Sequence, residues 1–256
     1  MSSSNFIRDI EGLICTLTFN RPEARNALTW EMYDALLDTC DLVDASDVRV
    51  FVIRGAGAAF SAGTDIAQFR EFRTGADGVA YERRLDTVID RLERVNKITI
   101  AAVNGAAVGG GCAIALACDL RVCSERARFG VPVARTLGNC LSAANLTRLA
   151  DAIGPARALD VMLTGRLIDA EEARQLGVAT RVVPSDSLDG EVAQVAEDLT
   201  RRAASTVLAT KVVMRRIREH RRPSAADDVI DACYGSAEFQ EGVAAFLAGR
   251  KPTFGG

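Results

Sequence analysis

The chain has 256 residues but only one histidine, His220. A Ser-His-Asp triad or a histidine-based metal site would have to use this residue. His220 lies in the basic stretch RRIREHRR, a setting that favours a solvated helix residue. Histidine-dependent catalysis and a histidine metal cluster are therefore poorly supported.

Paired cysteine motifs are also missing. The seven cysteines are scattered and odd in number, and none forms a C-x-x-C pair: Cys15, Cys40, Cys112, Cys118, Cys123, Cys140 and Cys233. This pattern argues against a zinc site and against a disulfide framework. We expect buried, reduced thiols in a cytoplasmic protein, and no metal.

No apolar run reaches the length of a bilayer span. The longest weakly polar stretch, ITIAAVNGAAVGGGCAIALAC, is interrupted by Asn104 and by glycines. The start, MSSSNFIRDIEG, lacks the basic and apolar regions of a secretory signal. The net charge of −3 gives no field that would favour nucleic acid or a membrane surface. We expect neither as a partner.

Strand-like and helix-like segments alternate up to about residue 184. FIRDI and LICTLTF predict a hairpin, VRVFVIRG and ITIAAVNG predict buried strands, and TRVVP predicts the last strand. Thr29 is a candidate N-cap, and Asp169 with Glu172 a candidate capping box. Residues 70–82 are charged and contain glycine, so we expect a mobile connection or lid there, with a helix from Leu85 to Val95.

From about residue 188 the pattern is helical only. One apolar stripe follows the helical repeat, at Leu199, Ala203, Val207, Val213 and Ile217. The sequence thus predicts an α/β core followed by a helical C-terminal part.

Two glycine-rich turns, FSAGTDI and VNGAAVGGGCAIAL, each follow a predicted buried strand and open a helix. The start of a helix presents unpaired N–H groups and a partial positive charge. Small residues let a ligand oxygen approach those groups. Two converging turns could hold a phosphate, or a thioester carbonyl that becomes an oxyanion.

The known phosphate motifs do not fit these turns. No lysine follows Gly110 as a P-loop would require, and Ile114 stands where G-x-G-x-x-G needs its last glycine. The G-x-S-x-G pattern also fails around Ser61. Close packing of a helix against a strand remains a purely structural explanation of the glycines.

Several long segments resemble the crotonase (enoyl-CoA hydratase/isomerase) superfamily, in the order in which that family has them. They are LTFNRPEARNALT, FSAGTDI, VNGAAVGGGCAIALACDLRV, ARFGVPV, LTGRLIDAEEARQLGVATRVVP and EGVAAFLAGRKPTF. The resemblance covers essentially the whole chain. It implies an α/β crotonase fold, with a ββα-spiral core over residues 1–195. A C-terminal helical region over residues 196–256 would build a homotrimer or a dimer of trimers.

The resemblance also implies an acyl-CoA thioester as substrate, with no separate cofactor. The backbone N–H groups of Thr64 and Gly110 would hold the thioester oxygen. The family's coenzyme A contacts fall on Ala24, Arg25, Ala62, Asp65 and Ile66. The acyl pocket would be lined by Val108, Gly109, Pro132, Val133 and Leu137.

Two positions depart from the family's hydratases. A glutamate follows the family's Gly-Gly-Gly-Cys run, where this chain has Ala113, and a second follows the proline of F-G-x-P, where it has Val133. A positioned acid or base contributes about 10²- to 10⁴-fold, and an oxyanion donor about 3–4 kcal/mol. We therefore expect this site to polarise a thioester but to hydrate an enoyl-CoA poorly unless another group substitutes.

The candidate substitutes fall into two groups. Asn139, Cys140, Ser142 and Asn145 follow the acyl-pocket segment, and none is a carboxylate. Glu71, Asp77 and Tyr81 lie within residues 70–82, where solvated loop residues are the simpler explanation. Cys112 is better explained as a buried residue than as a reactive thiol. Asp65 is explained as a residue that caps its own loop.

Three hypotheses follow. The first is a lyase or isomerase acting on CoA thioesters, with an unidentified acid/base group or with enolate stabilisation alone. The second is an acyl-CoA binding protein that has lost the chemistry. The third is a structural role in which RRIREHRR contacts an acidic partner or another subunit, although a solvated helix face is favoured there.

Overall fold

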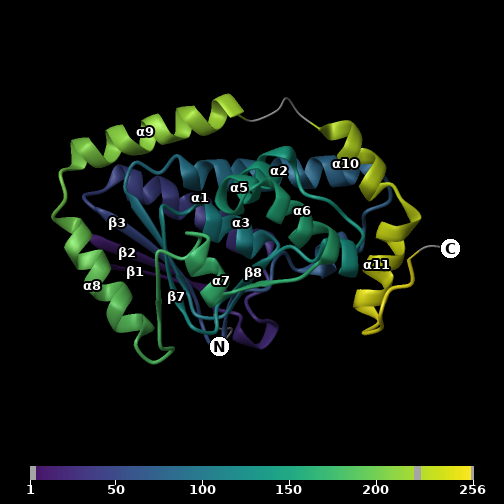
Figure 1. Cartoon of the computed structure of the whole chain (residues 1–256), viewed down its shortest axis with the longest axis horizontal. Helices are drawn as coiled ribbons and strands as arrows, with labels where there is room; N and C mark the ends of the chain where they lie inside the picture. The colour runs from purple at the N-terminus through teal and green to yellow at the C-terminus, as the bar shows by residue number, and fades with distance from the viewer. Residues whose placement is uncertain (1–3, 222–225, 255–256) are drawn as a thin grey trace.

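A six-stranded sheet in the order β1-β2-β3-β5-β7-β10 forms the centre of the computed structural model, which describes residues 4–221 and 226–254 (Figure 1). The β1–β2 pair is antiparallel and the other neighbours are parallel. The strands are β1 Phe6–Glu11, β2 Ile14–Phe19, β3 Val50–Gly55, β5 Ile98–Val103, β7 Leu120–Ser124 and β10 Arg181–Val183. The predicted hairpin and buried strands are confirmed.

Strand β3 is apolar at nearly every position because both of its faces are covered. Phe51 and Ile53 belong to the main core, whereas Val50 and Val52 pack in a second cluster with Leu188 of helix α8 (Leu188–Thr200). A strand buried on both sides does not alternate between polar and apolar residues. This packing explains the continuous run VRVFVIRG.

A second, smaller sheet in the order β4-β6-β8-β9 was not predicted. Its strands are β4 Ala59–Ser61, β6 Ala106–Val108, β8 Arg128–Gly130 and β9 Ile168–Asp169. Strands of two or three residues are too short to show a periodic pattern. They matter for function because β4 and β6, which are parallel neighbours, lead directly into the two glycine-rich turns.

The helices of the core follow the predicted signals at several ends. The α-helices are α1 Trp30–Ala45, α2 Gly75–Glu93, α3 Gly110–Ala117, α4 Val133–Thr136, α5 Ala143–Ile153, α6 Pro155–Thr164 and α7 Ala170–Gln175, and the 3₁₀ helices are η1 Pro22–Ala24 and η2 Ile66–Phe69. Thr29 caps α1 by accepting from the N–H of Met32, and Asp169 caps α7 by accepting from that of Glu172. Both predicted N-caps are confirmed, but the predicted capping box at α7 is incomplete, because the Glu172 carboxylate accepts from Arg166.

The expectation of a lid over residues 70–82 is wrong for most of that segment. Helix α2 begins at Gly75 instead of Leu85, and the Asp77 carboxylate accepts from the N–H of Thr74 at 2.8 Å in a capping box. A Cβ on Gly78 would lie 2.1 Å from the ring of Tyr234, in helix α10 (Asp227–Tyr234). The glycines that suggested a loop are thus needed for close helix packing.

The C-terminal helices lie around the core. Figure 1 shows α8 at one end, α9 (Ala204–Arg221) along one side, and α10 and α11 (Ala237–Leu247) at the opposite end. The predicted apolar stripe is only partly covered in the single chain, since Val213 is 53% and Ile217 44% exposed. His220 is exposed on α9, as predicted. None of the described helices has both the length and the apolar character needed to cross a bilayer.

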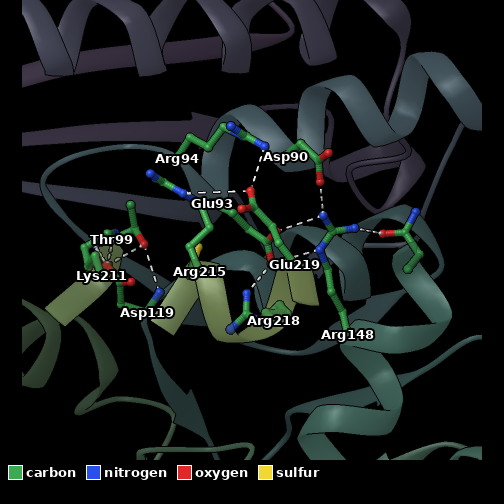
Figure 2. A network of polar contacts seen from close by, with 12 residues as sticks. Asp90, Glu93, Arg94, Thr99, Asp119, Arg148, Lys211, Arg215, Arg218 and Glu219 are labelled. Atoms are coloured by element: carbon green, nitrogen blue, oxygen red, sulfur yellow. Dashed lines mark hydrogen bonds and ion pairs between the residues drawn. The ribbon is translucent and has the colours of Figure 1, made fainter. Parts of the chain in front are cut away.

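Ion pairs connect α9 to the core (Figure 2). Lys211 pairs with Asp119, and Arg218 pairs with Glu93 of α2. Arg148 of α5 lies on the other side of Glu93, with its Nε 2.9 Å from a Glu93 carboxylate oxygen. A cavity of about 850 Å³ lies beside this network, between α9 and the core.

Candidate functional site

The two glycine-rich turns lie against each other. Gly63 has φ = +98°, and a Cβ there would be 3.0 Å from the carbonyl oxygen of Val108 and 3.6 Å from the nitrogen of Gly110. Gly109, which precedes α3, has φ = +54°. Only glycine adopts such angles without strain and permits this approach. Gly111 has the purely structural explanation, because a Cβ there would lie 2.7 Å from Ser61.

Two backbone N–H groups are available where the turns meet. Within residues 4–221 and 226–254, neither the N–H of Thr64 nor that of Gly110 donates to a protein acceptor. Gly110 is the first residue of α3, where unpaired N–H groups and the helix dipole favour a negative oxygen. The two residues expected to form an oxyanion hole are thus close together and have free donors.

A cluster of three buried hydroxyl groups supports this corner. The Tyr33 and Tyr81 hydroxyls lie 2.8 Å and 2.7 Å from the Oγ1 of Thr64. A Cβ on Gly110 would be 2.3 Å from the Tyr33 hydroxyl. Burial raises the pKa of both tyrosines, so both hydroxyls stay neutral. The cluster holds the Thr64 side chain and thereby helps to fix the backbone at this position.

Sequence reasoning missed this cluster. Tyr33 was not singled out, and Tyr81 was assigned to a solvated loop, whereas it is only 7% exposed. The overlooked signal is the helical spacing of Tyr81, Leu85, Val88 and Leu92, all of which are buried in α2.

The residues expected to contact coenzyme A lie along two neighbouring segments. The N–H of Ala62 donates to the carbonyl of Arg25 at 2.9 Å, and the N–H of Leu28 donates to that of Gly63 at 2.7 Å. The segment containing Ala24 and Arg25 therefore runs beside residues 62–66. Asp65 accepts from the N–H of Ala67 and pairs with Arg21, so its predicted role in capping its own loop is confirmed.

The residues expected to line the acyl pocket come from the end of β6, from Gly109 before α3, and from α4 with its two flanking residues. Strand β6 pairs with β8, with Val108 opposite Gly130, and the N–H of Gly109 donates to the Gly130 carbonyl at 3.0 Å. Pro132 and Val133 follow at the start of α4, and Leu137 ends it. Val133, Leu137 and Ala113 are each 8% exposed, so both positions of the absent glutamates are apolar and nearly buried.

The cysteines are free thiols. Cys112, next to the site, is 1% exposed, and burial raises its pKa to about 12, so the thiol stays protonated. All seven cysteines are unpaired. Among the described residues, no three or more histidine, cysteine, aspartate or glutamate side chains gather in a group that could hold a metal ion.

The polar residues after the acyl-pocket segment have structural partners. Ser142 caps α5 and donates through Oγ to Asp86 at 2.6 Å, and the Asn145 side chain donates to the same carboxylate. Asn139 donates to the Tyr234 hydroxyl at 3.0 Å. These contacts lead to a buried carboxyl that the sequence did not reveal, Glu82 of α2, which accepts from the N–H of Ser142.

Comparison with known proteins agrees with this geometry. The enoyl-CoA hydratase/isomerase family model matches residues 9–256. The chain belongs to this family. It is 34% identical over 245 residues to a probable enoyl-CoA hydratase of Mycobacterium tuberculosis, covering 93% of both chains. It is 31% identical to the short-chain-enoyl-CoA hydratase of Clostridium acetobutylicum, covering 98% of this chain and 97% of the relative.

A solved structure of the family shares the fold. The enoyl-CoA hydratase/isomerase of Xanthobacter autotrophicus Py2 superposes with a TM-score of 0.86 at 28% identity, covering 97% of this chain and 98% of that one. The expected crotonase fold with C-terminal helices is therefore confirmed, and in this chain its core contains two mixed sheets. The chain therefore belongs to a family whose enzymes act on acyl-CoA thioesters.

Proposed function

We propose that the protein holds the thioester carbonyl of an acyl-CoA between the N–H groups of Thr64 and Gly110 and stabilises the enolate formed from it. The observation that carries this proposal is the pair of adjacent N–H groups that have no acceptor within the described residues. Each such donor contributes about 3–4 kcal/mol to a transition state that carries charge on this oxygen. The start of α3 adds its partial positive charge.

The reaction class is a lyase or isomerase step on a CoA thioester, with hydration of simple enoyl-CoA substrates expected to be slow. Ala113 and Val133 supply no acid or base at the two positions that the family's hydratases use. Coenzyme A would lie along the paired segments around Arg25 and Asp65. The acyl group would extend toward Val133 and Leu137.

A second candidate is an acyl-CoA binding protein without turnover. The apolar, nearly buried side chains at positions 113 and 133 favour it, because they leave the pocket lined for binding and not for proton transfer. Both candidates require the same oxyanion hole, so one experiment can test the hole and another can separate them.

The test of the hole compares Gly110→Ala with Gly190→Ala. The new Cβ at 110 would lie 2.3 Å from the hydroxyl of the fully buried Tyr33, whereas a Cβ at 190 meets nothing within 4 Å. Calorimetry would measure the affinity of each protein for butyryl-CoA and for its thioether analogue S-butyl-CoA, which lacks the carbonyl oxygen. The wild type and Gly190→Ala should bind the thioester roughly tenfold more tightly than the thioether. The reason is that the two hydrogen bonds to the carbonyl oxygen contribute about 0.5–1.5 kcal/mol each.

Gly110→Ala should lose this preference. An equal affinity of the wild type for the two ligands would contradict the oxyanion hole, and absence of binding would contradict both candidates. Turnover of enoyl-, dienoyl- or hydroxyacyl-CoA substrates would then support the enzyme, and binding without turnover would support the binding protein.

A further inference from the structure

Glu82 is a buried carboxyl group on α2, the helix whose Tyr81 contacts Thr64. It is 2% exposed over the whole residue, and by that measure no other acidic residue that the structure describes is buried. Its two oxygens are held separately. One accepts from the Tyr234 hydroxyl at 2.7 Å, and the other accepts from the backbone N–H of Ser142 at 2.9 Å.

Glu82 differs from the other well-covered glutamate of the same helix in having no cation beside it. The Glu93 side chain is 5% exposed and lies between the guanidinium groups of Arg148 and Arg218 (Figure 2). No lysine or arginine of the described residues forms an ion pair with Glu82. A buried carboxylate without a cation is costly, and such groups are concentrated at functional sites.

Glu82 lies between contacts to the two parts of the proposed site, the oxyanion hole and the segment that follows the acyl pocket. Its neighbour in the chain, Tyr81, contacts the Oγ1 of Thr64, whose N–H belongs to the oxyanion hole. Its own carboxyl contacts Ser142, five residues after Leu137 of the acyl pocket. Glu82 therefore lies on the element that runs from the oxyanion hole to the acyl-pocket segment.

A purely structural role does not require a carboxyl at this position. The N-cap of α5 is formed by the Ser142 hydroxyl, which is held by Asp86. The remaining tasks of Glu82 are to accept from one backbone N–H and from one tyrosine hydroxyl. Neutral oxygen acceptors perform such tasks in most buried sites without the cost of an ionisable group.

We propose that Glu82 is the general acid/base of this site and replaces the glutamates that are absent at positions 113 and 133; this inference rests on the proposed function. The C2–H bond of the bound acyl-CoA breaks, its proton passes to a Glu82 carboxylate oxygen, and its electron pair forms the enolate. The thioester oxygen takes up the negative charge at the Thr64 and Gly110 N–H groups. Return of the proton from Glu82 to the acyl chain completes the cycle.

The environment of Glu82 suits proton transfer in both directions near neutral pH. Burial raises its pKa to about 7, and the hydrogen bonds from Tyr234 and Ser142 partly oppose this rise. An acid/base with a pKa near the working pH is effective in both protonation states. The titratable groups that face it are Tyr33 of α1, Tyr81 and Asp86 of α2, Cys140 after α4, and Cys233 and Tyr234 of α10.

The test measures deuterium incorporation at C2 of butyryl-CoA in D₂O by mass spectrometry. Wild-type protein should catalyse the exchange, and Glu82→Gln should reduce its rate at least about 100-fold, as expected for loss of a positioned base. Glu71→Gln is the matched control, because Glu71 is exposed on the segment before α2. This variant should catalyse the exchange at the wild-type rate. Butyryl-CoA binding is measured by calorimetry for each variant.

The outcomes separate this inference from the proposed function. Failure of the wild type to bind butyryl-CoA would overturn the function. Binding without exchange by the wild type, or exchange by Glu82→Gln within threefold of the wild-type rate, would overturn the role of Glu82 and leave the oxyanion hole intact.

A second variant keeps the inference testable if Glu82→Gln does not fold. Tyr234→Phe keeps the ring, which packs 4.7 Å from that of Phe239, and removes only the hydroxyl that lowers the pKa of Glu82. The wild-type exchange rate should rise with pH through about pH 7, because the carboxylate is the base. In Tyr234→Phe the midpoint should move to higher pH. A midpoint that does not move would contradict titration of Glu82.

Discussion

At the scale of single residues, the two positions where the family's hydratases carry glutamate are apolar in this chain, and glycines lie in the turns beside them. Gly63 and Gly109 have positive φ angles that only glycine adopts easily, and they bring the two turns together. Ala113 and Val133 are each 8% exposed and carry no proton-transfer group. We therefore expect ligand binding and proton transfer to be separable in this chain, because different residues would supply them.

Restoring both glutamates should test that separation. Ala113→Glu combined with Val133→Glu should make crotonyl-CoA hydration appear or rise, by about 10²-fold or more, if the oxyanion hole is intact. Hydration is followed by loss of absorbance of the conjugated thioester. Burial of two carboxyl groups in an apolar pocket raises their pKa and lowers the stability of the protein. The fold of the double variant must therefore first be checked by circular dichroism. A folded double variant without hydration would show that the pocket geometry also differs from that of the hydratases.

At the scale of the elements, helix α2 organises both the site and the core. Near its start, Tyr81 contacts Thr64, and Glu82 contacts Ser142 and Tyr234. Further along, Asp90 and Glu93 accept from Arg148 of α5, whose side chain is only 1% exposed. Figure 2 shows Arg148 between these acidic residues, with Arg218 approaching Glu93 from α9. Helices that are distant in sequence are thus connected through one charged cluster.

Removing the central cation of that cluster should destabilise the protein. Arg148→Met leaves the Glu93 carboxylate, which is only 5% exposed, with less compensating charge, and this costs about 3 kcal/mol of unfolding free energy. The change is measured by urea denaturation. Arg174→Met, which breaks an exposed pair with Glu171, should leave the unfolding free energy nearly unchanged. Equal effects of the two substitutions would contradict a special role for the buried cluster.

At the scale of the whole molecule, the helices α9 to α11 carry several exposed large apolar side chains. Val213 and Met214 are each 53% exposed on α9, and Phe246 is 56% exposed on α11. A cavity of about 850 Å³ separates α9 from the core. We expect this surface to be covered in a homotrimer or a dimer of trimers, as the family resemblance implies.

Light scattering after size-exclusion chromatography should therefore give three or six times the mass of one chain. Val213→Asp with Met214→Asp places two charges on the exposed apolar side of α9 and should shift the mass toward one chain. The same double substitution would leave the mass of a true monomer unchanged. A wild-type mass of a single chain would contradict the oligomer.

Some elements of this fold have local sequence patterns that predict them, and others do not. Long buried strands such as VRVFVIRG, the caps at Thr29 and Asp169, and the two glycine-rich turns carry local patterns that a sequence displays. The short strands of the second sheet carry none. Helix α2 was placed ten residues too late because Gly75 and Gly78, which suggest a loop, are required by the approach of α10.

By itself, the sequence determined the fold, the family and the class of ligand, because these depend on long motifs in a set order and on glycines that local geometry requires. It also determined that the two hydratase glutamates are absent. Only the tertiary structure decided which residues surround the oxyanion hole, since Tyr33, Thr64 and Tyr81 come from three separate elements. It alone brought Glu82 against Ser142 and Tyr234 and removed it from water, and burial is what raises the pKa of that carboxyl.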